Sequence, residues 1–253
     1  MTILMIGDVV GSPGRRILKK ELKKLKESYG ASAAVVNAEN CAAGSGITEL
    51  LAKEIFSAGA DAITLGDHTW GQKEFAGQIG RIEKLVRPAN FPSECPGRGW
   101  CIVTLPSFRF AVLNLQGRVF MQSVDCPFKA ADLALREIPA DIPVVVDFHA
   151  EATSEKVTLA NYLDGRISAL VGTHTHVQTA DERIIDGCGF ITDIGMSGPR
   201  DSIIGVKADA VLELFLTKKT SGFETAEGEV DIMGAIFEFD SKHRCISVER
   251  FKY

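Results

Sequence analysis

The sequence lacks the features that mark exported, membrane-spanning and nucleic-acid-binding chains. No apolar run approaches the roughly 18 residues that a membrane helix needs. Met1 to Val10 is apolar, but it has no basic region and contains Asp8, so it is not typical of a signal peptide. A net charge of -5 provides no field for a nucleic-acid polymer, which requires clustered Lys and Arg. We therefore expect a cytoplasmic protein that binds neither a membrane nor a nucleic-acid polymer.

Paired cysteine motifs and low-complexity linkers are also missing. The 6 cysteines show no CxxC and no paired spacing, which favours reduced, structural thiols. The 253 residues, with 45% apolar content, are enough for one large globular domain or two small ones. Because no boundary is visible, we expect a single domain over residues 1–253.

The most informative stretch that is present is Gly172-Thr173-His174-Thr175-His176, which follows the apolar run 167–171. That run is typical of a buried strand, so both histidines lie at its end and can turn toward one point. Two neutral imidazoles in one place suit a divalent metal ion. A pair of hydrogen-bonded loop histidines would be the simpler explanation of an isolated HxH pattern. The interpretation therefore depends on where the other candidate ligands lie.

Apolar runs and amphipathic stretches alternate along the chain. The expected strands are 2–6, 33–37, 62–65, 144–146 and 167–171. The expected helices are one that contains 17–25 and those at 48–57, 72–79, 127–136, 154–163 and 207–216. The expected hairpins join 102–105 to 110–115, 183–185 to 190–193, and 230–239 to 245–251. This pattern predicts an α/β fold, a layered αββα sandwich of two sheets flanked by helices.

Carboxylates, an amide and histidines recur directly after these strands. The residues concerned are Asp8, Glu39, Asn40, Asp67, His68, His149, His174 and His176. Open α/β sheets build their sites at the carboxyl ends of the strands, so these side chains can meet although they are far apart in sequence. His243, in the last hairpin turn, is the exception and is expected at the surface.

The chemistry of this set favours metal ions over a nucleotide-binding loop. It holds more ligands than one tetrahedral zinc ion needs, and it suits two ions that share a carboxylate. Mixed nitrogen and oxygen ligands fit manganese, iron or zinc best. The glycine-rich turn 11–14 matches neither GxGxxG nor GxxxxGK, so it gives little support to phosphate binding by backbone amides.

The same motifs resemble those of a known family. Gly7-Asp8, Gly66-Asp67-His68, His149 and the 172–176 stretch resemble, in that order, the calcineurin-like binuclear metallophosphoesterases. Over nearly the whole chain the sequence is similar to the bacterial YmdB-like phosphodiesterases, in the segments GDVVGSPGR, NAEN, RPANFP, NLQGR, DFHAEATSEK, VGTHTHVQTAD and ITDIGMSGP. The resemblance implies a two-metal enzyme, often with iron, that hydrolyses small phosphodiesters such as 2',3'-cyclic nucleotides. Enzymes of this kind can assemble into homo-oligomers.

The resemblance also implies a role for each residue of the set. The residues implied for one ion are Asp8, Glu39, Asn40 and His176. Those implied for the second ion are Asp67, His149 and His174, together with Glu39 as a bridge. A hydroxide shared by the two ions would attack phosphorus, and His68 would protonate the leaving group.

Residue 67 departs from the family pattern, which usually has asparagine there. With Asp67, the charges of two divalent ions, the carboxylates and a hydroxide sum to about zero, whereas asparagine would leave about +1. We expect Asp67 to bind metal more tightly, to weaken the attraction for an anionic substrate and to make the shared water less acidic. A ligand exchange without consequence is the alternative.

Several neighbouring residues have less defined roles. Asp147 and Glu151 flank His149 and could either orient a ligand imidazole or cap the next helix. Loop arginines that could bind phosphate, if they are not simply solvated, are Arg87, Arg118 and Arg200. Residues expected to fix local turns are Thr173, Thr175 and Gln178.

Two other functions are compatible with the sequence. Two-metal sites also hydrolyse amides and carboxylic esters, although the order of the motifs favours phosphorus. The other function is that of a regulatory protein that binds a nucleotide or a partner and turns over substrate poorly. Asp67 gives this function some support.

Overall fold

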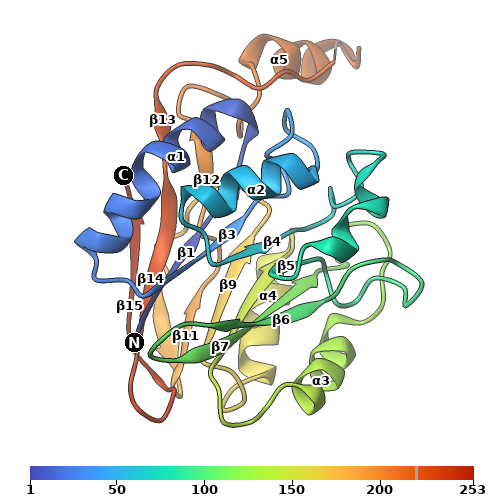
Figure 1. The fold of residues 1–253 in the computed structure, drawn as a ribbon. Coiled ribbons are helices and arrows are strands. Elements are labelled where there is room, and N and C mark those ends of the chain that lie inside the picture. Colours follow the sequence, from blue (N-terminus) through green and yellow to red (C-terminus); the bar gives the residue numbers. More distant parts are fainter. Residues whose placement is uncertain (220–221) are drawn as a thin grey trace.

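Two six-stranded sheets and the helices outside them build the structure, a computed structural model that describes residues 1–219 and 222–253 (Figure 1). One apolar cluster fills the space between the sheets, and two others lie between each sheet and its helices. This four-layer arrangement confirms the αββα fold class expected from the sequence.

The first sheet joins the start of the chain to its end. Its order is β15 (Cys245–Lys252), β14 (Met233–Phe239), β1 (Thr2–Ile6), β3 (Ala33–Asn37), β4 (Ala62–Thr64) and β5 (Leu85–Val86). Strands β1, β3, β4 and β5 are parallel, and the β14–β15 hairpin pairs antiparallel with β1.

The second sheet comes from the middle of the chain. Its order is β10 (Arg183–Ile185), β11 (Cys188–Ile191), β9 (Ala169–Thr173), β8 (Val144–His149), β7 (Arg109–Gln116) and β6 (Trp100–Thr104). Strands β7, β8, β9 and β11 are parallel, and β6 and β10 are antiparallel edges. A small third sheet has the order β13 (Val230–Asp231), β12 (Met196–Pro199) and β2 (Asp8–Val9).

The alternation of side chains along β1 decides which layer each residue enters. Successive residues of a strand face opposite sides, so Leu4 and Ile6 join the cluster beneath the helices while Ile3 and Met5 join the cluster between the sheets. Because both faces are covered, the strand is apolar at nearly every position, as expected for a buried parallel sheet.

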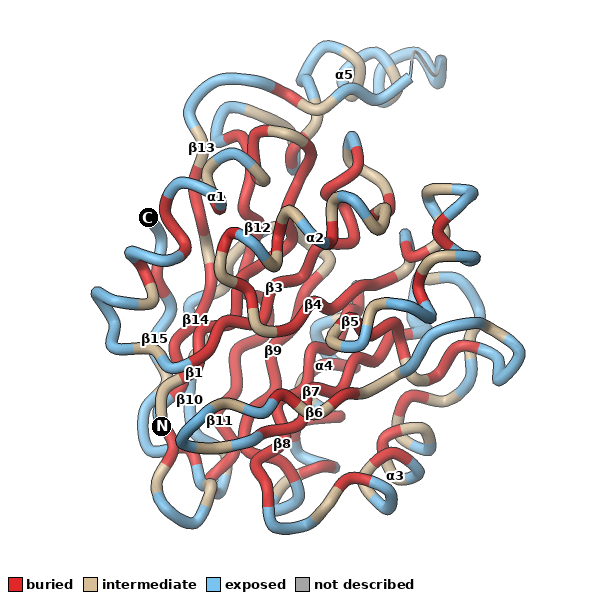
Figure 2. Tube along the Cα trace, in the orientation of Figure 1, coloured by how far each residue is buried: buried red, intermediate tan, exposed pale blue. Residues whose placement is uncertain are grey.

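Four helices cover the outer faces, and a fifth does not. Helices α1 (Gly11–Ser28) and α2 (Glu49–Ala58) pack on the first sheet, and α3 (Pro127–Glu137) and α4 (Thr153–Tyr162) pack on the second. Helix α5 (Ala208–Thr217) has no buried residue and stands apart from the layers at one end of the molecule (Figures 1 and 2). None of the helices in the described ranges is long and apolar enough to cross a membrane.

The expected helix at 72–79 is wrong. This stretch forms two short 3-10 turns, η1 (Phe75–Gly77) and η2 (Ile79–Arg81). Only Phe75 and Ile79 are buried in these turns, so the stretch has no apolar stripe long enough to hold an α-helix, and glycines at 77 and 80 weaken it further.

Other expected elements occur with shifted ends. Strand β9 extends to Thr173 rather than ending at Val171, because Gly172 and Thr173 pair with the last residues of β8. The expected strand 230–239 is divided at Ile232 into β13 and β14. The short strands β2, β5 and β12 were not expected, since two to four residues are too few to show a period. The thiols of the cysteines are all free, as expected.

Candidate metal centre

The residues singled out in the sequence lie together where strands of both sheets reach their carboxyl ends. Asp8, Glu39, Asn40, Asp67 and His68 lie just beyond strands β1, β3 and β4. His149 ends β8, and His174 and His176 follow β9. Contacts among their side chains bring all of these residues into one site, and their binding of metal stays a prediction.

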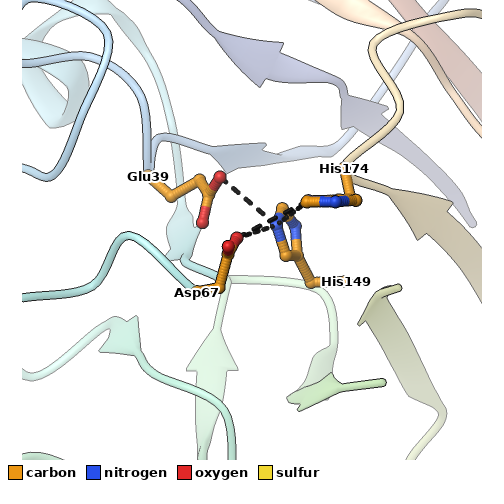
Figure 3. Close-up of side chains that lie close together, drawn as sticks. All are labelled: Glu39, Asp67, His149 and His174. Carbon is orange, nitrogen blue, oxygen red and sulfur yellow. Dashed lines mark hydrogen bonds and ion pairs between the residues drawn. The ribbon is translucent and has the colours of Figure 1, made fainter. Parts of the chain in front are cut away.

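Four of these side chains form a tight cluster (Figure 3). Glu39, Asp67, His149 and His174 each offer one ligand atom, and these atoms lie within 4.8 Å of one another. Nε2 of His149 is 3.0 Å from Oδ1 of Asp67, 3.2 Å from Oε1 of Glu39 and 3.1 Å from Nδ1 of His174. These residues are the ones that the family resemblance implies for the second ion.

A second group adjoins the first through Glu39. Nδ2 of Asn40 lies 2.9 Å from Oε1 of Glu39 and 3.1 Å from Nε2 of His176. Nε2 of His176 is in turn 4.0 Å from Oδ1 of Asp8. Glu39 therefore lies between the two groups, in the position that a bridging ligand would need.

Two glycines let the backbone come close to this cluster. A Cβ atom at Gly66 would overlap the side chains of Glu39 and His149, and one at Gly172 would overlap the carbonyl of Thr192. The motifs at 66–68 and 172–176 therefore begin with glycine because any larger residue would displace a neighbour.

A buried chain of hydrogen bonds fixes the orientation of His149. Oγ1 of Thr173 donates to the Asp147 carboxylate at 2.7 Å, so it must accept from Nδ1 of His149 at 2.9 Å. The other nitrogen, Nε2, is then left facing the cluster. Thr173 was expected only to fix a turn, and that prediction is wrong. Asp147 acts on His149 through the Thr173 hydroxyl rather than by a direct hydrogen bond.

The other two imidazoles are oriented in the same way. Nε2 of His174 lies 3.1 Å from the Glu151 carboxylate, and Nδ1 of His176 donates to the carbonyl of Ile204 at 2.8 Å. Each histidine thus has its outward nitrogen bound and its inward nitrogen turned toward the cluster. Of the two roles expected for Glu151, this contact supports the orientation of an imidazole, that of His174, and not a cap of the next helix.

The donor set fits metal ions. Oδ1 of Asp8 is buried and has no hydrogen-bond partner among the described residues, while Oδ2 accepts from the backbone N–H of His174 at 3.2 Å. An orphaned carboxylate oxygen is costly in a protein interior unless a cation satisfies it. The inward nitrogens and carboxylates offer the mixed ligands that manganese, iron and zinc accept.

Without a bound cation, the side chains of the cluster shift one another's pKa values. Burial raises the pKa of Asp8 to about 7. Burial acts to lower the pKa of His149, but Glu39 and Asp67 outweigh it and raise this pKa well above its ordinary value. Burial lowers the pKa of His176, which keeps its imidazole neutral. A proton on His149 therefore serves as the counter-charge that a bound cation would replace.

His68 lies at the open side of the same cluster. Its Nδ1 is 2.8 Å from Oδ1 of Asn40 and 3.3 Å from Oε1 of Glu39, and the hydrogen bond to Glu39 raises its pKa. Nε2 makes no hydrogen bond within the described part of the chain. His68 also lines a cavity of about 670 Å³ that opens beside the cluster, together with His174 and His176.

The remaining candidates lie elsewhere. Arg87 is buried and donates to backbone carbonyls of its own loop, and Arg200 pairs with Asp231. Neither they nor Arg118 are among the described residues that line the cavity. Gln178 donates to backbone carbonyls of the first sheet, so it ties the segment after His176 to that sheet rather than fixing a turn.

The sequence interpretation missed a buried ion pair beneath the histidine motif. Nζ of Lys156 lies 2.8 Å from Oδ2 of Asp193, and both side chains are buried. The same oxygen accepts from the backbone N–H of Thr175 at 3.2 Å and from its hydroxyl at 2.8 Å. Asp193 follows an apolar strand as the other candidates do, so the same positional rule could have found it.

Comparison with known proteins shows close relatives. The model of the family described as "YmdB-like protein" matches residues 4–251. A "2',3'-cyclic-nucleotide 2'-phosphodiesterase" of Bacillus subtilis is 46% identical over 99% of this chain and 96% of its own length. The crystal structure of a hypothetical protein from Thermus thermophilus superposes with a TM-score of 0.94 at 37% identity, over 100% of this chain and 99% of that one. That of "a novel phosphatase" from Mycoplasma pneumoniae also gives 0.94, at 33% identity, over 100% and 93%.

Proposed function

The chain belongs to the YmdB-like family, and from this premise we propose that it is a metal-dependent phosphodiesterase that opens 2',3'-cyclic nucleotides at the site described above. The observation that carries the proposal is the convergence of three inward imidazole nitrogens on the carboxylates, next to the orphaned oxygen of Asp8. The name of the Bacillus subtilis relative supports the substrate class.

Two metal ions are part of the proposal. The residues that would hold them are Asp8, Glu39, Asn40, Asp67, His149, His174 and His176. When bound, the ions would lower the pKa of an attacking water and neutralise charge that develops on the phosphoryl oxygens. The mixed nitrogen and oxygen ligands suit iron, manganese or zinc. We propose iron first because the family that the sequence resembles often carries it.

His68 is the residue that we assign to proton transfer. Its Nδ1 is held by Asn40, so the proton that it can give away is on Nε2, which has no partner among the described residues. The hydrogen bond to Glu39 raises the pKa of His68, which favours the protonated form that a general acid needs. As water adds to phosphorus, the bond from phosphorus to the 2' oxygen breaks, and that oxygen takes the proton from His68. The water loses one proton to solvent, and His68 regains a proton from solvent before the next turnover. The product is a 3'-monophosphate.

We propose that the enzyme acts in the cytoplasm on a small diester. The free thiols of all the cysteines support a reducing compartment. No Lys or Arg is present among the described residues that line the cavity, which supports a small substrate rather than a nucleic-acid chain.

The test of this function combines metal analysis with a substrate panel. Protein purified without chelator should contain close to two transition-metal ions per chain. It should hydrolyse 2',3'-cyclic nucleotides and bis(p-nitrophenyl) phosphate, and it should leave amide substrates intact. Loss of metal by dialysis against a chelator should abolish turnover, and manganese or iron should restore it. A metal-loaded protein that cleaves no phosphodiester would refute the proposal.

The role of His68 can be tested through the leaving group. His68→Gln should lower turnover of a 2',3'-cyclic nucleotide by about 10²–10⁴-fold, because the ribose oxygen needs a proton to depart. Turnover of bis(p-nitrophenyl) phosphate should fall far less, since p-nitrophenolate leaves without one. His243→Gln is the matched control in the last hairpin turn. Equal losses on both substrates would show that His68 is not the proton donor.

A further inference from the structure

The cavity beside the metal centre has two unlike sides. One side carries His68, His174 and His176. The other is formed by apolar residues of helix α5 and of the segments before and after it. These residues are Ile203, Ile204, Val206, Val211, Leu214, Phe215 and Phe223.

Three of these side chains leave much of their apolar surface in water. The exposed fractions are 51% for Ile204, 73% for Phe215 and 55% for Phe223. Figure 2, in which the chain trace is coloured by burial, shows no buried residue in α5. Single exposed apolar residues are ordinary, but aromatic residues gathered at the rim of a catalytic cavity are typical of a surface that a ligand covers.

Ile204 is also held in a strained conformation. Ile203 and Val206 exchange backbone hydrogen bonds of 2.9 and 3.0 Å, so Ile204 and Gly205 form the tip of a tight turn. Their φ angles are +47° and +100°, as in the type I′ turns that favour asparagine and glycine. A β-branched residue with positive φ is an outlier, and such strain is retained mainly at functional sites.

The strained residue serves the site in two ways. Its carbonyl accepts the hydrogen bond from Nδ1 of His176, and its side chain lines the cavity. An asparagine at this position would keep the carbonyl and relieve the strain. What isoleucine adds is apolar surface toward the cavity.

We propose that Ile204, Phe215 and Phe223, which we call the apolar wall, bind the nucleobase of the substrate. This inference rests on the proposed function and deepens it. The described lining contains no Lys or Arg to attract a second phosphate, and Glu151 and Glu224 disfavour a polyanion. A neutral, planar ring suits an aromatic and aliphatic wall. The cavity of about 670 Å³ is within the range for ligands of nucleotide size.

The apolar wall should bind any of the four bases and should not distinguish between them. Stacking on aromatic side chains is worth about tenfold or more in affinity per base, and every base has a face that can stack. The subsite should therefore lower KM for all four 2',3'-cyclic nucleotides relative to a cyclic phosphate that has no base.

The test compares adenosine 2',3'-cyclic phosphate with methyl riboside 2,3-cyclic phosphate, which lacks the base. In the wild type, kcat/KM should favour the nucleotide by about tenfold or more. Phe223→Ala and Ile204→Asn should bring this ratio close to one, mainly through KM. Leu216→Ala is the matched control, because Leu216 is 81% exposed on α5 but does not line the cavity. It should keep the wild-type ratio.

Binding of adenosine, measured by calorimetry or saturation-transfer NMR, separates the subsite from the chemistry. Adenosine binding that Phe223→Ala abolishes supports the subsite even if the wild type hydrolyses neither substrate, in which case only the proposed function fails. The subsite is overturned if the wild type does not bind adenosine, or if binding and the kcat/KM ratio survive both substitutions. It is also overturned if Phe215→Ala changes the molecular mass in light scattering and leaves adenosine binding intact, since the wall would then be a contact between copies.

Discussion

At the scale of single residues, Asp67 contributes one of the carboxylates of the proposed metal centre. Its Oδ1 is 3.0 Å from Nε2 of His149 and 3.5 Å from Nδ1 of His174, so it belongs to the tight cluster. An asparagine there keeps an oxygen ligand but removes one negative charge. We predict that Asp67→Asn weakens manganese binding by about 10–100-fold and raises turnover of bis(p-nitrophenyl) phosphate at saturating manganese.

The measurement is a calorimetric manganese titration together with kcat/KM over a range of pH. Asp141→Asn makes the same change of charge at the surface, where Asp141 pairs with Arg109, and it should leave both quantities unchanged. If Asp67→Asn gained no turnover at any pH, the exchange of asparagine for aspartate at this position would have no consequence for activity.

The residues of the site could be predicted from position alone, but their partners could not. Asp8, Glu39 and His149 each follow an apolar run, and the rule that parallel strands end at one edge brings them together. Thr173 and Ile204 have no such signal. Their roles depend on a buried hydroxyl and on one carbonyl at the tip of a turn, and neither can be recognised before the fold is known.

At the scale of elements, the segment after β9 is strained and needs an anchor. His174 and His176 have φ angles of +98° and +65°, a region that residues other than glycine rarely enter. Between them, the backbone and hydroxyl of Thr175 are held by the Asp193 carboxylate, which pairs with Lys156 of α4. The ion pair therefore connects the helix layer to the histidine motif.

Breaking this pair should destabilise the protein and loosen the motif. We predict that Lys156→Met lowers the free energy of unfolding by about 3–5 kcal/mol, because the Asp193 charge stays buried without its partner. Urea unfolding of metal-free protein measures this change. Arg109→Met, which breaks an exposed pair, should cost less than about 1 kcal/mol. A loss for Lys156→Met as small as that of the control would contradict the anchoring role.

Helices and strands could be predicted from the sequence where their apolar residues recur over enough positions to show a pattern. Strand β1 and helix α1 were expected because apolar residues recur over many positions. The stretch 72–79 misled the prediction, since a few apolar residues at helical spacing also suit the 3-10 turns η1 and η2. Strand β9 gained its last two residues from pairing with β8, a tertiary contact that its own sequence does not encode.

At the scale of the whole molecule, the proposed metal centre lies where the two sheets meet. Asp8, Glu39 and Asp67 come from the carboxyl end of the first sheet, and His149 and His174 come from that of the second. An ion bound by residues of both sheets binds the folded chain but not the unfolded one. Its binding free energy therefore adds to the stability of the entire sandwich.

We predict that manganese stabilises the metal-free protein as a unit. At about 100 times its Kd, one ion adds about 2.7 kcal/mol, which corresponds to a rise in Tm of about 5–10 °C for a chain of this size. Scanning calorimetry with manganese and then with excess chelator measures the rise and its reversal. His174→Ala should lose most of it, because this side chain contributes one of the cluster's ligands from the second sheet, whereas His243→Ala should keep it. If His174→Ala responded to manganese as fully as the wild type, the stabilising ion would be bound elsewhere, and the proposed metal centre would not link the two sheets.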